Sequence, residues 1–305
     1  MLDRSRARRR RTAARHHERR GPLSVHNIRI PAKNVRVFRT LGPRSARRGL
    51  APARGAREDR AMSIPAASEP VPARVRDLAG DAALEPVWRN AIGGVTFRAA
   101  GADGIRFVKV GPRNAETSMR AEAERLRWAG AFTPVPRVLD QGQDAAHEWL
   151  VTEAMPGLSA VDPRWIADPA RAVRAVGRGL RALHEALPVA ECPFSWAVPD
   201  RLTNAAGRGI RVPDDLRDAP PIDRLVVCHG DACVPNTLVA DDGEWSAHVD
   251  LGALGVADRW ADIAVAAMST TWNYGPGWEE PLLEAYGVTP DATRLAYYRA
   301  LWNAT

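Results

Sequence analysis

The chain has 305 residues, 26% of them charged, and a formal net charge of +7 at neutral pH. It contains no apolar run near the roughly 18 residues that a membrane span requires, and its three cysteines lack the paired spacing of a metal cluster. We therefore expect no membrane association, and the odd cysteine count favours a reducing, cytoplasmic location over a disulfide framework.

The positive charge is confined to the beginning of the chain. Residues 1–61 contain 18 arginines and one lysine against four acidic residues, whereas the remainder contains 24 basic and 32 acidic residues, a balance of −8. The basic segment has no sustained apolar period, so we predict a disordered extension. Three interpretations of this segment remain open. It could bind nucleic acid or an anionic surface, it could be an organelle transit peptide, or it could have no role. Because it lacks aromatic interleaving and any recognisable module, we expect no role, and no nucleic-acid binding elsewhere.

Two segments, 95–98 and 105–110, alternate apolar and polar residues around an Asp-Gly turn, the pattern of a β-hairpin. Gly93 and Gly94 come just before the first segment. Glycines there would let backbone amides approach a phosphate, although an ordinary turn has the same composition. The second segment contains Lys109, the one lysine after Lys33 in a chain that otherwise uses arginine. This choice indicates that a compact ammonium group is needed, with a surface lysine as the alternative.

The next elements follow in chain order. An amphipathic helix is predicted over 115–130, an apolar strand over 149–155 that ends at Pro-Gly, and a second helix over 168–187. His184 lies on the apolar face of that second helix, so we expect it to be packed rather than catalytic. Short strands at 237–240 and 246–249 flank an Asp-Asp-Gly turn.

The most informative pattern is His229-Gly230-Asp231, with Asn236 five residues after the aspartate and Asp250 fourteen residues after the asparagine. Phosphoryl transfer from ATP uses these groups: one carboxylate orients and deprotonates the attacking hydroxyl, while an amide oxygen and a second carboxylate hold Mg²⁺. We therefore predict Asp231 as the catalytic residue and Asn236 and Asp250 as metal ligands, brought together by the hairpin between them. The alternative is that these are ordinary turn residues.

A further helix is expected to begin near Asp258, which is a suitable N-cap residue. Arg259 and Asp262 in its first turn are expected to support the catalytic loop rather than react. His229 is expected to position the loop through hydrogen bonds.

The pattern His-Gly-Asp-x-x-x-x-Asn followed by Asp-x-Gly resembles the catalytic loop and metal motif of protein kinases. With glycine after the histidine, it is similar to the aminoglycoside phosphotransferase family, closest in appearance to the 3′- and 3″-phosphotransferases. The resemblance covers about residues 85–305 and is most specific at 226–264. It implies an α+β, protein-kinase-like, two-lobed fold. A small, antiparallel β-rich N-lobe would occupy 62–153, and a larger, mainly helical C-lobe would occupy 154–305.

The resemblance also implies roles for the nucleotide site, with ATP and Mg²⁺ as cofactors. Lys109 would clamp the α- and β-phosphates, and Glu122, preferred over Glu124, would pair with it. The backbone of Thr152 and Ala154 would contact adenine at the hinge between the lobes.

The implied activity is ATP-dependent O-phosphorylation of an aminoglycoside at its 3′- or 3″-hydroxyl, and hence antibiotic resistance. Phosphorylation of another metabolite, such as a sugar or amino alcohol, and nucleotide binding without turnover remain alternatives. An acidic body would attract a polycationic substrate, with Trp272 stacking on a sugar ring and Glu279, Glu280 and Asn303 nearby. The chain departs from the family by having Asn303 in place of an acid and Ala253 in place of an arginine.

Overall fold

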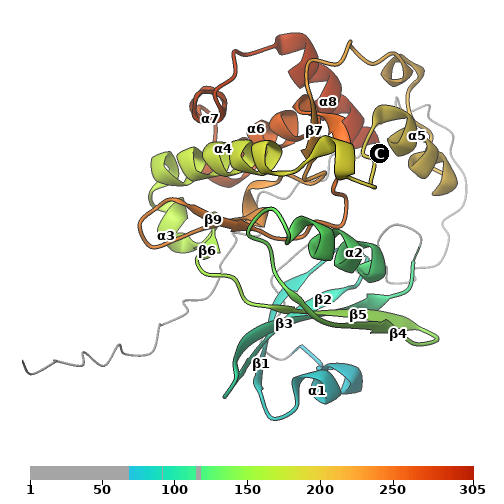
Figure 1. Cartoon of the computed structure of the whole chain (residues 1–305), viewed down its shortest axis with the longest axis vertical. Coiled ribbons are helices and arrows are strands. Elements are labelled where there is room, and N and C mark those ends of the chain that lie inside the picture. Colours follow the sequence, from blue (N-terminus) through green and yellow to red (C-terminus); the bar gives the residue numbers. More distant parts are fainter. Residues whose placement is uncertain (1–68, 91, 115–117) are drawn as a thin grey trace, which may run out of the picture.

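The computed structural model describes residues 69–90, 92–114 and 118–305. The predicted basic extension, 1–61, lies outside the described residues. Figure 1 shows two lobes, with the larger β-sheet in the lower lobe and most of the helices in the upper lobe. Strand β5 ends at Glu153, at the residue where the sequence predicts the boundary between the lobes.

Five of the described strands form the antiparallel sheet of the N-lobe, in the order β1-β2-β3-β5-β4. Helix α1 packs against it and helps to enclose a small apolar core around Phe97 and Val108, both fully buried. The elements of this lobe are α1 (Ala73–Ala79), β1 (Ala83–Arg89), β2 (Val95–Gly101), β3 (Gly104–Pro112), α2 (Met119–Ala129), β4 (Val138–Gln143) and β5 (His147–Glu153).

Strand β1 changes the interpretation of the glycine pair. The sequence predicts the first strand at 95–98, but β1 precedes it and pairs with β2 along its whole length, with a bulge near Pro86. Proline is tolerated because β1 is an edge strand, where a missing amide donor breaks no ladder. Gly93 and Gly94 therefore lie in the turn of a β-hairpin.

The C-lobe is mainly helical, as predicted. Its helices are α3 (Pro163–Ile166), α4 (Pro169–Ala186), α5 (Val198–Gly207), α6 (Trp260–Tyr274), α7 (Glu279–Tyr286) and α8 (Ala292–Ala304). Its strands are short: β6 (Leu158–Ser159), β7 (Leu225–Cys228), β8 (Thr237–Val239), β9 (Trp245–His248) and β10 (Gly255–Asp258). None of the described helices has the length and apolarity needed to cross a membrane.

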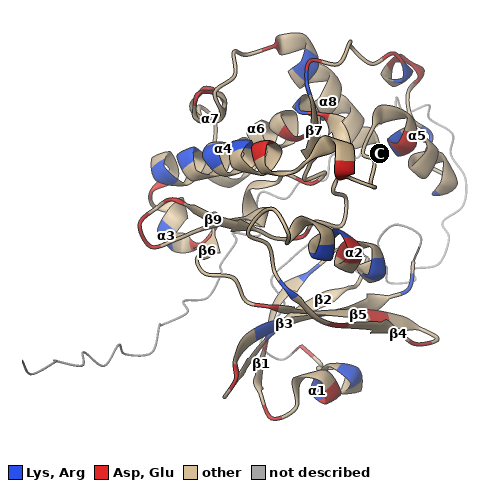
Figure 2. Cartoon of the chain, in the orientation of Figure 1, with Lys and Arg blue, Asp and Glu red and all other residues tan. Residues whose placement is uncertain are grey.

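Helix α4 forms the centre of this lobe because its apolar positions recur at helical spacing. Val173, Val176, Leu180 and Leu183 are all buried, which confirms the predicted apolar face. Asp168 caps the helix by accepting the amide of Arg171. The charged face of α4 is exposed, and Figure 2 shows basic residues recurring along it.

Close contact between α4 and α7 requires a glycine on α4. A Cβ atom on Gly177 would lie 2.7 Å from the Cβ of Ala285 and 2.8 Å from the carbonyl oxygen of Leu282. The two helices therefore approach each other at a distance that no larger residue at this position would allow. This packing fixes the end of α7, which contributes Tyr286 to the support of the catalytic loop described below.

Candidate active site

Lys109 joins the two lobes through an ion-pair triad. Its Nζ lies 2.6 Å from Glu122 Oε1 on α2 and 2.9 Å from Asp250 Oδ1 after β9. Glu122 is 7% exposed, whereas Glu124 is directed to a surface pair with Arg120. The predicted Lys109–Glu122 pair is thus confirmed, and the alternative partner Glu124 is excluded. The same lysine places Asp250, 141 residues further along the chain, at the nucleotide side of the site.

The charges of this triad stabilise one another. Burial lowers the pKa of Lys109, but the attraction of Asp250 and Glu122 outweighs burial and raises it above the usual value. Lys109 in turn lowers the pKa of Asp250. Burial raises the pKa of Glu122, against the attraction of Lys109. Both shifts favour the charged forms, so at neutral pH the lysine is a cation and Asp250 is an anion suited to a metal ion.

Asp250 has an unusual backbone. Its φ is +66°, and among the described residues it is the one non-glycine with a positive φ. Aspartate tolerates this left-handed conformation better than most residues, and such strain is often kept at functional sites. The carboxylate is directed to Lys109 while its side chain remains 49% exposed, which leaves oxygen available for another ligand.

Asp231 and Asn236 lie at the two ends of the loop after β7. The Asn236 Nδ2 donates to the Asp231 backbone oxygen at 2.9 Å and to its Oδ2 at 3.2 Å. The Asn236 backbone oxygen accepts the amide of Val249 at 3.0 Å, so the chain leading to Asp250 runs beside Asn236. The predicted hairpin, formed by β8 and β9, thereby brings the two sequence motifs together, as expected.

The donor set fits a divalent cation and an attacking hydroxyl. The Nδ2 of Asn236 is used inside the loop, which leaves its amide oxygen without a hydrogen bond in the described structure, and Asp250 offers an exposed carboxylate oxygen. Mg²⁺ favours such oxygen ligands. Asp231 Oδ1 is buried and accepts no hydrogen bond from the described residues. A buried acceptor without a partner is suited to a donor supplied by a ligand.

Burial controls the protonation of Asp231. It raises the pKa of this carboxyl above the usual value, although the hydrogen bond from Asn236 to Oδ2 favours the ionised form. The nearby Asp250 carboxylate adds to the increase. A raised pKa makes a carboxylate a stronger base, which is the property required for removal of a proton from a hydroxyl group.

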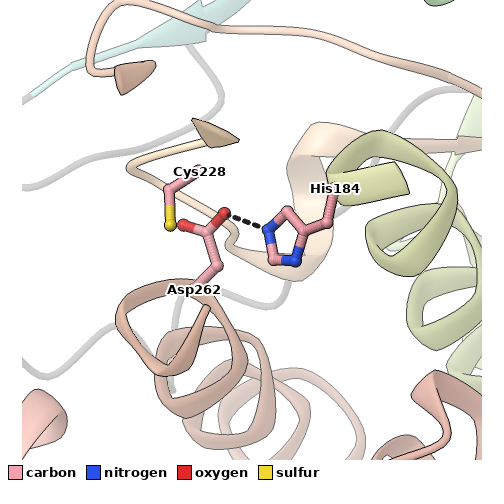
Figure 3. Close-up of side chains that lie close together, drawn as sticks. All are labelled: His184, Cys228 and Asp262. Carbon is pink, nitrogen blue, oxygen red and sulfur yellow. Dashed lines mark hydrogen bonds and ion pairs between the residues drawn. The ribbon is translucent and has the colours of Figure 1, made fainter. Parts of the chain in front are cut away.

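Asp262 anchors the catalytic loop from behind. Its carboxylate, completely buried, accepts the amides of His229 at 2.5 Å and Gly230 at 2.9 Å. His184 on α4 donates to it from Nε2 at 3.0 Å and contacts the Tyr286 hydroxyl at 2.9 Å through Nδ1. Figure 3 shows His184 and Asp262 facing each other from two helices. The predicted supporting role of Asp262 and packed role of His184 are both confirmed.

Cys228 lies close to this pair, and one atom from each of His184, Cys228 and Asp262 falls within 4.8 Å of the others. Such a cluster has the composition of a metal site. However, both carboxylate oxygens and both imidazole nitrogens already form hydrogen bonds within the protein. We therefore assign the cluster to support of the loop rather than to metal binding.

Two further contacts shape the loop. His229 interacts through Nε2 with the Val249 oxygen at 3.0 Å, while its Nδ1 accepts the amide of Asp231, which confirms its predicted positioning role. Gly230 has φ +85°, and a Cβ there would lie 2.2 Å from the Ala253 oxygen. This explains glycine in His-Gly-Asp by backbone geometry alone.

One supporting contact differs from the prediction. Arg259 does not reach the catalytic loop. It forms an ion pair with Asp223, 2.6 Å away, and its amide donates to the Arg224 oxygen. It therefore holds the segment that leads into β7, one element before the loop.

The other residues predicted to contact the nucleotide lie in the β1–β2 turn and at the end of β5. Gly93 and Gly94 lie in the β1–β2 turn, and Gly94 approaches β3, where a Cβ on Gly111 would be 3.0 Å from the Gly94 Cα. Thr152, at the end of β5, is paired on both sides of the strand. The amide of Ala154 donates to the Ile105 oxygen at 3.1 Å.

The four predicted substrate residues lie along α6, α7 and α8. Trp272 packs on Trp302 with a ring separation of 5.7 Å. Asn303 is exposed, and its Nδ2 lies 4.0 Å from the Met268 sulfur. This part of α6 also reaches the catalytic loop, since the Ser269 hydroxyl accepts the amide of Val234 at 3.0 Å.

The two predicted acidic substrate residues have different surroundings. Glu279 is paired with Arg299, so much of its charge is already neutralised. Glu280 is exposed and has no hydrogen bond or ion pair in the described structure. Both line an open pocket of about 480 Å³ at the beginning of α7.

Sequence reasoning did not identify Tyr286 or Asn90. Tyr286 acts only through His184, a contact between residues 102 positions apart that no local pattern encodes. Asn90 forms hydrogen bonds within the glycine turn. An asparagine three residues before a glycine pair is a turn signal that could have revealed it.

A model of the phosphotransferase enzyme family (APH) matches residues 94–298. The chain is 38% identical over 227 residues to an aminoglycoside 3′-phosphotransferase from Streptomyces fradiae, which covers 64% of this chain and 84% of the relative. It is 37% identical over 239 residues to a streptomycin 3″-kinase from Streptomyces griseus, covering 68% and 86% of the two chains.

Solved structures agree with these relatives. The chain matches the aminoglycoside phosphotransferase APH(3″)-Id from Streptomyces rimosus, also determined with ADP and streptomycin, at a TM-score of 0.60 and 30% identity, covering 76% of this chain and 96% of that one. An aminoglycoside 3′-phosphotransferase of type VIII matches at a TM-score of 0.64 and 30% identity, with coverages of 76% and 97%. The predicted kinase-like, two-lobed fold is confirmed, and the chain belongs to the phosphotransferase enzyme family.

Proposed function

We propose that the protein is an ATP-dependent O-phosphotransferase that acts on the 3′- or 3″-hydroxyl of an aminoglycoside. The observation that carries this proposal is the convergence of Lys109, Glu122 and Asp250 on one side of a site whose other side is formed by Asp231 and Asn236. A nucleotide-binding protein without turnover would need the first group but not the second. Relatives named as aminoglycoside 3′- and streptomycin 3″-kinases support the substrate class.

In this proposal the residues divide the work between nucleotide and acceptor. The backbone of Thr152 and Ala154 contacts adenine, Gly93 and Gly94 approach the phosphates, and Lys109 binds them as a cation held in place by Glu122. Phosphoryl transfer depends chiefly on positioning and on neutralising charge. The ion pair with Glu122 serves positioning because it fixes a long, flexible side chain.

Asn236 and Asp250 would hold Mg²⁺, which supplies positive charge at the transferred phosphoryl group. Asp231 accepts the hydrogen bond of the substrate hydroxyl through its unpartnered Oδ1. It takes the proton as the hydroxyl oxygen bonds to the γ-phosphorus of ATP and the bond from that phosphorus to the bridging oxygen breaks, which releases ADP. The network behind it, from Asp262 to the amides of His229 and Gly230, keeps the carboxylate in position.

The substrate side is proposed to lie along α6 and α8. Trp272, three residues after Ser269 on α6 and packed on Trp302, would stack on a sugar ring. Glu280 is an unpaired carboxylate for an ammonium group, whereas Glu279 would first have to leave Arg299. Asn303 offers an amide where an acid would bind a cation more strongly.

The test is a coupled assay of ADP release with streptomycin, with an aminoglycoside that carries a free 3′-hydroxyl, and with simple sugars and amino alcohols. Asp231→Asn should lower kcat by about 10²–10⁴-fold and leave ADP affinity within twofold of the wild type. Asp241→Asn, which changes an exposed aspartate outside the site, is the matched control. If a sugar or amino alcohol is phosphorylated and no aminoglycoside is, the proposed aminoglycoside substrate is wrong, but the proposed phosphoryl transfer from ATP still holds.

Asn303→Asp tests the substrate side. A carboxylate at this exposed position should attract a polycation, so KM for the aminoglycoside should fall while kcat changes little, the signature of uniform binding. Raising the salt concentration should reduce the difference, because exposed charges are screened within roughly 10 Å. An unchanged KM would show that Asn303 does not contact the substrate.

A further inference from the structure

In the turn between β1 and β2, backbone amides donate hydrogen bonds to Asn90, the first residue of the turn. Asn90 Oδ1 accepts the amide of Gly94 at 2.6 Å and that of Ile92 at 3.2 Å. The amide of Gly93 donates to the backbone oxygen of Asn90 at 3.2 Å, and the Asn90 amide donates to the Gly94 oxygen at 2.9 Å. Every described amide that follows Asn90 in this turn is therefore bound to Asn90.

A nucleotide phosphate at this turn would need the same donors. Glycine turns bind phosphates by directing amide N–H groups at the oxygens, and an N–H that donates to Asn90 is not free for a second strong bond. Gly94 is buried, so its amide depends on a protein or ligand acceptor rather than on bulk water. We infer that the Asn90 side-chain oxygen competes with a nucleotide phosphate for these amides and so sets nucleotide affinity, an inference that depends on the nucleotide binding proposed above.

Two other donors of the proposed nucleotide site are satisfied in the same way. Lys109 donates to Asp250, and the Ala154 amide donates to the Ile105 oxygen at 3.1 Å. Each of these bonds would be exchanged for one to the nucleotide. Asn90 differs from the others because its side chain has no part in the proposed chemistry, so it can be changed without loss of a reacting group.

The competition predicts whether each of two substitutions raises or lowers the affinity for ADP. Asn90→Ala removes the internal acceptor, which costs the ligand-free protein a hydrogen bond but leaves the bound protein unaffected. ADP should therefore bind about five- to tenfold more tightly, the equivalent of one buried hydrogen bond. Asn90→Asp keeps the acceptor and adds a negative charge beside the phosphates, so ADP should bind at least about fivefold more weakly.

The experiment is calorimetric titration of the full chain and its variants with ADP and Mg²⁺, and with adenosine, which lacks phosphates. Adenosine affinity should be the same in the wild type, Asn90→Ala and Asn90→Asp. Asp144→Ala is the matched control, because Asp144 Oδ1 accepts the amides of Ala146 and His147 in the β4–β5 turn of the same sheet. It should leave ADP affinity unchanged.

The outcomes separate this inference from the proposed function. Failure of the wild type to bind ADP would refute the proposed function. If the wild type binds ADP, an unchanged or weaker affinity in Asn90→Ala refutes the competition. Weaker binding in Asn90→Ala with normal binding in Asn90→Asp would show that Asn90 holds the turn in a productive shape. Should Asn90→Ala not fold, Asn90→Asp alone decides, because competition requires weaker ADP binding with unchanged adenosine binding.

Discussion

Asp262→Asn tests the anchor of the catalytic loop. The carboxylate is 0% exposed and receives three hydrogen bonds, from the amides of His229 and Gly230 and from His184. Asparagine keeps one acceptor oxygen, here at the position that accepts the Gly230 amide. Its NH₂ group replaces the oxygen that accepts both His229 and His184. His184 can change tautomer to accept from the new NH₂ group, but the His229 amide cannot.

The expected cost follows from this accounting. One buried amide is left without an acceptor, which costs about 1–3 kcal/mol, and the remaining bonds lose the assistance of a charge. We expect the free energy of unfolding to fall by about 2–4 kcal/mol. For a domain of this size that corresponds to a decrease in Tm of about 5–12 °C. Because the loop carries Asp231, kcat should fall as well.

The pH dependence provides a second readout. Burial alone would raise the pKa of Asp262, but His184 and the amide of Gly230 outweigh it and lower that pKa. Stability from this group is therefore present above the pKa of the unfolded chain and is lost as pH falls through the lower pKa of the folded protein. Asp262→Asn should remove this part of the acid dependence.

The assay is urea unfolding followed by tryptophan fluorescence, at neutral pH and in a series down to about pH 2, because an aspartate in the unfolded chain titrates at about 3.9 and the folded-state pKa of Asp262 is lower. The control is Asp241→Asn, whose side chain is 83% exposed in its pair with Arg164. This control should lie within about 0.5 kcal/mol of the wild type. A change below about 1 kcal/mol in Asp262→Asn would refute the assigned network.

Two further predictions concern the reacting groups. Lys109→Arg should raise KM for ATP and lower kcat despite the equal charge, because a planar guanidinium cannot reproduce the compact ammonium between Glu122 and Asp250; unchanged kinetics would remove the special role of this lysine. Because burial raises the pKa of Asp231, the acid limb of the kcat–pH profile should lie above the usual titration range of an aspartate. A profile that is flat down to pH 4 would contradict a catalytic base at this position.

Local sequence patterns were sufficient to predict several elements of the fold and most of the candidate site residues. Helical spacing predicted the helix over 168–187 and the buried face of α4. Residue types at fixed spacing pointed to Asp231 as the candidate base and to Asn236 and Asp250 as candidate metal ligands, because metal and proton chemistry restrict which side chains can serve. The single lysine of the body singled out Lys109. In contrast, Pro86 concealed strand β1, since proline predicts against a strand unless its edge position is known.

The tertiary structure decided which of these groups meet. Helical periodicity and charge do not distinguish Glu122 from Glu124; the family resemblance favoured Glu122, and in the structure Glu122 pairs with Lys109 whereas Glu124 pairs with Arg120. The same holds for Asp262, whose partners His184 and His229 are 78 and 33 residues away. Periodicity and motif spacing report on neighbours along the chain. Buried polar groups are instead satisfied by whichever donors the packing of distant elements supplies, and that packing is set only when the whole chain has folded.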